Sequence, residues 1–163
     1  PMGRRKWILG VVLFALPTFW CGHFALFAND SVTIRVQHYP ENAFLRIPEF
    51  FSGNEYSGDK LIIRTNSDRE GLYFSIPLGK KNSLIRNAKS IELQFIESTN
   101  PIPRISTYSI SEISAEKESL LLGVTGKDWN QSTMKLVAWK VLILDSANKQ
   151  IFTSQSTLWG HQE

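Results

Sequence analysis

The sequence predicts an all-β sandwich of about seven or eight antiparallel strands, preceded by one N-terminal transmembrane helix. Three observations lead to this fold class. An uncharged apolar run lies near the N-terminus, apolar and polar residues alternate after it, and turn-forming residues recur at short intervals. After residue 30 no long segment carries a helical stripe, and 163 residues suit a single domain.

The apolar run at residues 7–28 is long enough to cross a membrane. It contains 22 residues without formal charge, and a helix of this length rises about 33 Å, against a hydrocarbon core of about 30 Å. Trp7 at its start suits the membrane–water interface. The run predicts a retained single-span anchor in contact with membrane lipid.

The charges before the run set its orientation. Three cations precede it, namely Arg4, Arg5 and Lys6, and cytoplasmic flanks of membrane spans are rich in such cations. We therefore expect a cytoplasmic basic tail at 1–6 and an extracytoplasmic domain at 29–163.

A cleaved signal peptide is the alternative interpretation of the same segment. It has a basic start, an apolar middle and a tolerable cleavage site at Leu26-Phe27-Ala28. The apolar part of a signal peptide is usually about 7 to 15 residues long, which is shorter than this run. The retained anchor is therefore our prediction, and cleavage stays open.

Four residues inside the run are candidates for helix packing. Pro17 predicts a kink, and Gly10 and Gly22 allow another helix to approach closely. His23 is ionisable, which marks a functional candidate within a membrane segment. We expect it to make a polar contact near the interface, with ligation of a metal or a pigment as the alternative.

Charge and cysteine content exclude several function classes. Of 18 Lys and Arg residues, three precede the run, which leaves 15 against 15 Asp and Glu after it. A neutral domain does not predict nucleic-acid binding, which needs a basic surface. The single cysteine, Cys21, lies in the run, so the domain has no disulfide or thiolate site, which favours the bacterial periplasm.

Alternating segments predict the individual strands. Residues 32–37 and 91–95 alternate apolar and polar side chains. Polar turns between apolar runs predict two hairpins, the second turning at Asn148: 61–64 with 72–77, and 137–144 with 150–153. We expect further strands at 43–51, 104–110 and 119–125, and a polar loop or a single helical turn at 111–119.

The late strands resemble those of immunoglobulin-like and fibronectin-type sandwiches. A strand at 120–125, a polar connection with Trp129 and a long strand with a central Trp139 carry this resemblance. It covers about 40 residues and lacks the cysteine pair of antibody domains. It implies an immunoglobulin-like fold with Trp139 in the core, and it implies no activity.

The domain lacks recognisable catalytic motifs. It has two histidines, His38 and His161, without zinc-ligand spacing, and it has no nucleophile elbow and no phosphate-binding loop. We therefore predict no enzyme activity, no cofactor and no metal. A hydrolase, the alternative, would need His38 beside a carboxylate and near a serine or threonine.

Five aromatic residues are candidate partner contacts. Adjacent Phe50 and Phe51 on a strand would point to opposite faces, one into the core and one, with Tyr56, toward another protein or the membrane surface. Trp129 and Trp159 are either exposed anchors for a protein or a sugar, or caps on the ends of the sandwich.

These features predict a non-catalytic accessory or scaffolding subunit. Its anchor would pack beside other integral membrane subunits while the domain covers the extracytoplasmic face of the complex. The alternative is an exported envelope module that binds a glycan or a protein after its signal peptide has been cleaved.

Overall fold

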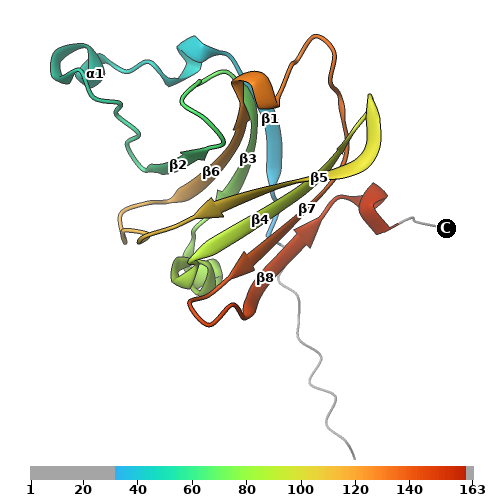
Figure 1. Ribbon diagram of the computed structural model, residues 1–163. Coiled ribbons are helices and arrows are strands. Elements are labelled where there is room, and N and C mark those ends of the chain that lie inside the picture. The colour runs from blue at the N-terminus through green and yellow to red at the C-terminus, as the bar shows by residue number, and fades with distance from the viewer. Residues whose placement is uncertain (1–31, 161–163) are drawn as a thin grey trace, which may run out of the picture.

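The computed structural model describes residues 32–160, except the side chains of residues 80–83. The anticipated basic tail and anchor, with Trp7, Gly10, Pro17, Gly22 and His23, lie outside the described residues. In the described part of the chain, no helix has the length and apolarity that crossing a membrane requires. Eight strands within residues 32–160 form two facing four-stranded sheets, which confirms the all-β sandwich (Figure 1).

The first sheet has the order β1-β3-β6-β2 and contains one parallel pair, β6 with β2. The hairpin expected between 61–64 and 72–77 is wrong, because β6 lies between these strands. Almost every residue of β6 is buried, and a strand that is apolar on both faces belongs inside a sheet. The strands are β1 (Arg35–Tyr39), β3 (Gly71–Pro77), β6 (Ser119–Thr125) and β2 (Lys60–Arg64).

The second sheet has the order β5-β4-β7-β8 and is antiparallel throughout. The expected hairpin of the last two strands is confirmed, with Asn148 in the left-handed conformation at φ 57°. The strands expected at 104–110 and 119–125 are also present, and 111–119 is mostly a loop. The strands are β5 (Asn100–Ser109), β4 (Ser90–Glu97), β7 (Leu136–Leu144) and β8 (Gln150–Gln155).

The main core lies between the two sheets. Ile91, Leu93 and Phe95 alternate along β4 and are fully buried, as period-2 patterning predicts. Trp139 of β7 packs edge-on against Phe74 of β3, with ring centroids 5.9 Å apart. Its expected place against the core is therefore confirmed.

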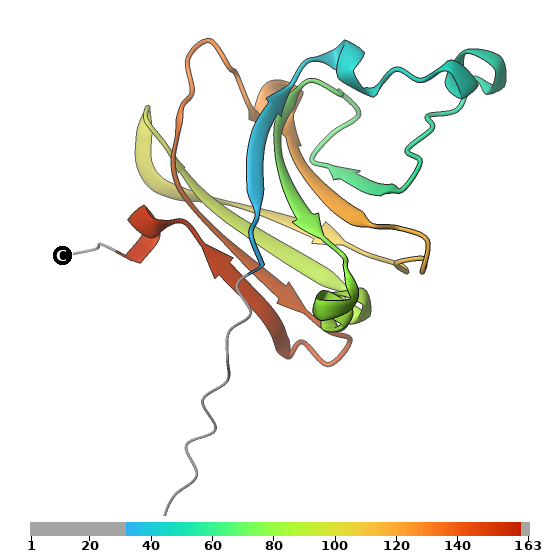
Figure 2. The same ribbon diagram turned by 180° about the vertical axis from the view of Figure 1, so that it is seen from behind.

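Residues 40–59, here called the excursion, leave the sandwich between β1 and β2 (Figures 1 and 2). They contain the 3-10 helix η1 (Glu41–Phe44) and the α-helix α1 (Ile47–Ser52), so the strand expected at 43–51 is wrong. Pro48 occupies the first turn of α1, where its fixed φ is suitable and its missing N–H costs nothing. Gly53 ends the helix at φ 68°, and its N–H donates to the Glu49 carbonyl at 2.8 Å.

Three further 3-10 helices connect or follow the strands, at η2 (Lys80–Asn87), η3 (Gly126–Asp128) and η4 (Thr157–Gly160).

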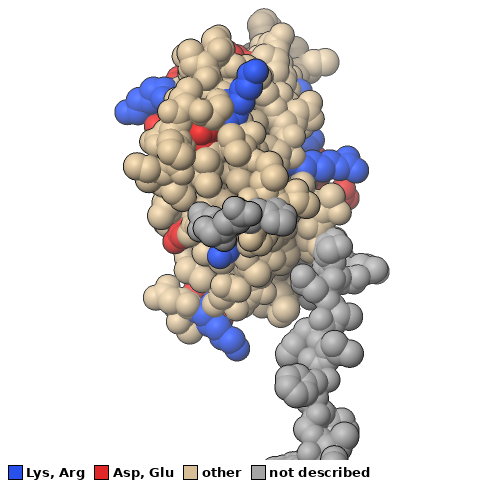
Figure 3. Space-filling model, turned by 90° about the vertical axis from the view of Figure 1, so that its right-hand side faces the viewer, with Lys and Arg blue, Asp and Glu red and all other residues tan. Residues whose placement is uncertain are grey.

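The side of the molecule opposite the excursion is seen in Figure 3. There the charged side chains are scattered among uncharged ones, and basic residues do not gather into a stripe.

Gly71 is a position where the sheet tolerates no side chain. A Cβ there would meet the Val124 carbonyl oxygen and would lie 2.7 Å from the Cα of Thr125. Because these are backbone atoms of β6, Gly71→Ala should destabilise the protein by about 1–3 kcal/mol in chemical denaturation. The matched variant Gly79→Ala has open space around its new methyl and should be neutral or slightly stabilising. Equal effects of the two variants would contradict the register of β3 against β6.

Candidate functional site

The excursion packs on the outer face of the first sheet. Phe44 covers Tyr73 and Leu121 there, and the three side chains form a second buried cluster outside the main core. The Phe44 and Tyr73 ring centroids lie 4.8 Å apart, and the Tyr39 ring is 5.5 Å from each. The base of the excursion is therefore attached to the sheet by aromatic packing.

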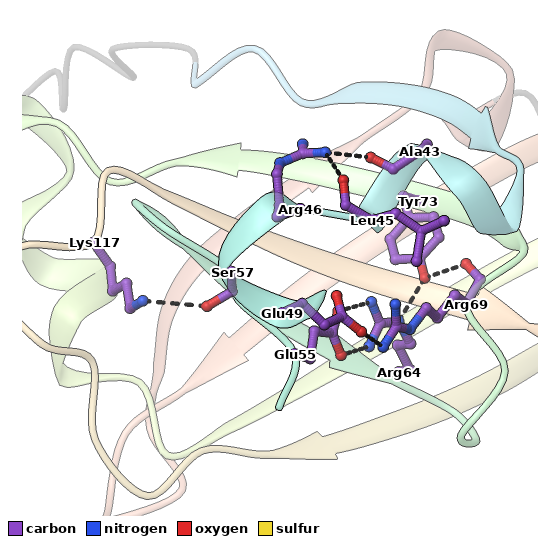
Figure 4. A network of polar contacts seen from close by, with 10 residues as sticks. All are labelled: Ala43, Leu45, Arg46, Glu49, Glu55, Ser57, Arg64, Arg69, Tyr73 and Lys117. Carbon is purple, nitrogen blue, oxygen red and sulfur yellow. Dashed lines mark hydrogen bonds and ion pairs between the residues drawn. The ribbon is translucent and has the colours of Figure 1, made fainter. Parts of the chain in front are cut away.

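Arg64 of β2 connects this cluster to the outer part of the excursion (Figure 4). Its two terminal nitrogens donate to the Glu55 carboxylate at 2.8 and 2.6 Å, and its Nε donates to the Tyr73 hydroxyl at 2.7 Å. Its guanidinium also lies over the Phe44 ring, 4.8 Å from the centroid. Bidentate arginine–carboxylate pairs of this kind fix both distance and orientation.

A second arginine holds the helix itself. Arg69, which precedes β3, pairs with Glu49 in the first turn of α1. The Tyr73 hydroxyl donates to the Arg69 carbonyl at 2.6 Å, so both arginines contact the same tyrosine. Glu49 precedes the aromatic pair Phe50 and Phe51 in the sequence and Glu55 follows it, and Figure 4 shows the two glutamates close together beside the arginines. The first turn of α1 and the segment after the helix are therefore both attached to the sheet.

The charges in this network are stabilised in place. The hydrogen bond from Arg64 lowers the pKa of Glu55 below its ordinary value. Burial raises the pKa of Tyr73, which keeps its hydroxyl protonated as a donor. Burial alone would lower the pKa of Arg64, but its bonds to Glu55 and Tyr73 outweigh that effect and raise it.

The outer surface of the excursion is apolar and exposed. Phe50 and Phe51 are 88% and 81% exposed, Ile47 is 78% exposed and Leu45 is 58% exposed. We call these four residues the apolar tip. No residue of α1 is buried. The helix is held through Glu49 while its apolar residues face solvent, the reverse of a usual surface helix. Exposed apolar patches of this kind mark interaction sites.

A cavity of about 230 Å³ lies between the excursion and the sheet, and we call it the socket. Its apolar wall comes from Tyr39, Phe44, Ile62 and Leu121. Arg46 also lines it and is fixed by hydrogen bonds from Nη1 to the carbonyls of Ala43 and Leu45, both at 2.9 Å. On the other side, Lys117 donates to the Gly58 carbonyl at 2.7 Å and holds the loop that closes the socket.

The structure brings three of the five anticipated contact residues into this region. Phe50 and Phe51 are both exposed on α1, which corrects the expectation that one of them enters the core. Tyr56 is 53% exposed and lines the socket. Sequence reasoning missed Leu45 and Ile47, although a proline followed five residues later by glycine is the signal of a short helix.

The two tryptophan candidates lie elsewhere. Trp129 is only 5% exposed, its ring packs against Phe95, and its Nε1 donates to Gln131 at 3.1 Å. It therefore caps the core and is no exposed anchor, because its apolar surface is already used inside the domain. Trp159 is half-buried in η4.

Part of the geometry that a hydrolase would require, a histidine beside a carboxylate, is present at the end of β1. His38 Nε2 is buried without a hydrogen-bond partner among the described residues, and it lies 3.6 Å from Glu70 Oε1. No hydrogen bond links it to a serine or threonine in that part of the chain. Residues 32–160 also contain no group of three His, Cys, Asp or Glu side chains that would hold a metal ion.

Acidification should loosen the excursion. Because the folded-state pKa of Glu55 lies below its ordinary value of 4.5, the stability it contributes is present above pH 4.5 and is lost as the pH falls through the lowered pKa. Hydrogen exchange of residues 46–59, corrected for the intrinsic pH dependence, should therefore accelerate below pH 4.5. Glu55→Gln should show fast exchange already at pH 7, whereas Glu112→Gln, at an exposed loop position, should behave as wild type. Unchanged exchange in Glu55→Gln would contradict the role of this pair.

Comparison with protein-family models, with curated proteins and with solved structures found no match for this chain. Its function therefore has to be inferred from its own residues and geometry.

Proposed function

We propose that this protein is a non-catalytic accessory or scaffolding subunit of a membrane complex. Residues 7–28 anchor it as a single span, and the excursion contacts a protein partner on the extracytoplasmic side. The observation that carries this proposal is the apolar tip, which is exposed although two arginine–glutamate pairs fix its position.

The fixed position is what distinguishes the tip from an ordinary surface loop. Burying one phenylalanine side chain stabilises a protein by about 1.5–3 kcal/mol, so a mobile loop carrying two of them tends to collapse onto the domain. Here Arg69 binds Glu49 of α1, Arg64 binds Glu55 just after the helix, and the phenyl rings stay outside. Because the rings are already held in position, little conformational entropy is lost when a partner covers them, which favours binding.

A protein partner suits the position of the tip better than the membrane surface does. The first described residues and the start of β1 lie at one end of the sandwich, and the excursion begins at the other end of β1 (Figures 1 and 2). An anchor before β1 would therefore hold the tip away from the lipid. The excursion also contains a single cation, Arg46, so it offers no cluster of basic residues to anionic headgroups.

We also propose that the sandwich is immunoglobulin-like. An immunoglobulin-like arrangement is supported by two facing four-stranded sheets and by Trp139 between them. The parallel pairing of β2 with β6 departs from a purely antiparallel sandwich.

The alternative is an exported binding module with a cleaved signal peptide. A polar cleft of about 510 Å³ favours it, lined among others by Asp68, Glu70, Lys127 and Asn130. Sugar-binding sites commonly offer an exposed aromatic face, whereas Trp129 in this cleft is 5% exposed. The tip therefore supports the assembly role better than the cleft supports glycan binding.

Removing the apolar character of the tip should release the partner. Phe50→Asp with Phe51→Asp should reduce co-purification from native membranes in mild detergent by about tenfold or more, because both rings would leave the interface. Quantitative mass spectrometry of the material purified with an affinity-tagged copy, in membranes that also hold a distinguishable untagged copy, measures this loss. Thermal unfolding of the chain separated from its partner should change little, since neither ring is buried within the chain itself.

The matched control is Ile102→Asp with Ile105→Asp, which introduces the same charges at exposed residues of β5 and should leave co-purification unchanged. Alkaline carbonate extraction tests the anchor in parallel, and the uncleaved chain should stay in the membrane pellet. Release of the full-length chain, or equal losses in both double variants, would contradict the proposal.

A further inference from the structure

Resting on the proposed function of the excursion, we propose that the partner it contacts is a second copy of this chain. The apolar tip of each copy enters the socket of the other, and the two copies form a two-fold symmetric dimer. Four observations on the excursion support this choice of occupant: the size of the socket, the location of tip and socket, the charge balance and the exposed area.

The socket is large enough for a phenyl ring, and it combines an apolar wall with polar residues such as Ser57 and Asp59 at its other side. Its volume is about 230 Å³, and apolar cavities of about 150 Å³ already accept benzene. The rings of Tyr39 and Phe44 in its wall are tilted by 57° to each other. A third ring can therefore pack edge-to-face against one of them, which is the preferred geometry of aromatic pairs.

The tip and much of the socket wall belong to the same 20-residue segment. The tip spans Leu45 to Phe51, while Ala43, Phe44, Arg46 and Tyr56 contribute to the socket. A two-fold axis beside the excursion can therefore satisfy both contacts at once. Such an interface closes after two copies, whereas a distant tip and socket would generate open chains of molecules.

The charges on the excursion do not oppose a second copy. Glu49 is paired with Arg69, Glu55 with Arg64, and Asp59 lies 3.8 Å from Lys60. The two charges that remain on the segment, Glu41 and Arg46, have opposite signs. Two identical surfaces of this kind carry little net charge against each other, so like-charge repulsion is small.

The exposed apolar area is sufficient for a dimer. With aromatic side chains of about 150–250 Å² each, Phe50, Phe51 and Tyr56 together expose roughly 450 Å² per copy, and the exposed Leu45 and Ile47 add to this area. A standard protein interface buries about 800 Å² per partner. The tip and the socket rim therefore account for most of one interface without other surfaces.

Pairing of two β2 edges or of two β5 edges is a less suitable route to the same dimer. Antiparallel pairing of two β2 edges about Ile62 would bring Lys60 of one copy opposite Arg64 of the other, which places like charges in contact. One edge of the other sheet is β5, where Pro101 and Pro103 remove two backbone donors. Insertion of side chains avoids both obstacles.

Site-directed cross-linking of two tagged full-length copies in native membranes tests the inference. Both copies carry Cys21→Ser, one carries Phe51→Cys in the tip, and the other carries Ala43→Cys in the socket wall. Oxidation should give a disulfide-linked pair at least about tenfold above the control pair of Phe51→Cys with Ile105→Cys on the opposite sheet. Native mass spectrometry of the wild-type chain in mild detergent should show a dimer. Phe50→Asp with Phe51→Asp should weaken that dimer by about a hundredfold.

The outcomes separate this inference from the proposed function. A wild-type monomer that still captures another protein through the tip overturns the second copy as partner and leaves the docking role intact. Residues 7–28 covering the tip would give a monomer in which the tip is protected from solvent. That result would overturn both the second copy as partner and the proposed docking role. A dimer that gives no cross-link between positions 51 and 43 above the control overturns the insertion into the socket.

Discussion

The guanidinium of Arg64 is the contact on which the outer part of this structure depends. It meets a carboxylate on Glu55, a hydroxyl on Tyr73 and the ring of Phe44, and these groups belong to the excursion and to the sheet beneath it. A largely buried cation that loses its carboxylate is strongly unfavourable. The excursion can leave the sheet only if Arg64 either loses its partner or follows it into water, and this cost keeps α1 in place.

Tyr73 links the Arg64 contact to the strands inside the sandwich. It lies on β3, which is paired on both sides, and its hydroxyl donates to the Arg69 carbonyl while accepting from Arg64. Gly123 of β6 makes room for its ring, since a Cβ at that position would lie 2.6 Å from it. A largely exposed segment of the described chain is thus connected through one tyrosine to two largely buried strands, β3 and β6. An exposed apolar surface that is also rigid suits recognition, because little freedom is lost when it is covered.

The arrangement of charge fits assembly through side chains. The part of the chain after the apolar run carries equal numbers of cations and anions, and the glutamates near the apolar tip are already paired within the molecule. The free-energy cost of removing water from these glutamates at an interface is therefore partly offset by their arginine partners within the same molecule. Basic residues and prolines on edge strands meanwhile limit pairing of backbones. The apolar tip therefore offers the least costly contact for a neighbouring protein.

The sequence by itself determined the elements whose signals are local. Alternation along β4 and the β7–β8 hairpin with its turn at Asn148 could be predicted, because periodicity and turn chemistry depend on adjacent residues. Only the tertiary structure decided that β2 pairs with β6, that Trp129 is buried and that glutamates on the excursion meet Arg64 and Arg69. These outcomes depend on which surfaces, far apart in the sequence, release the most free energy when they are buried against each other. All possible pairings along the chain compete for this, so no local sequence pattern contains the answer.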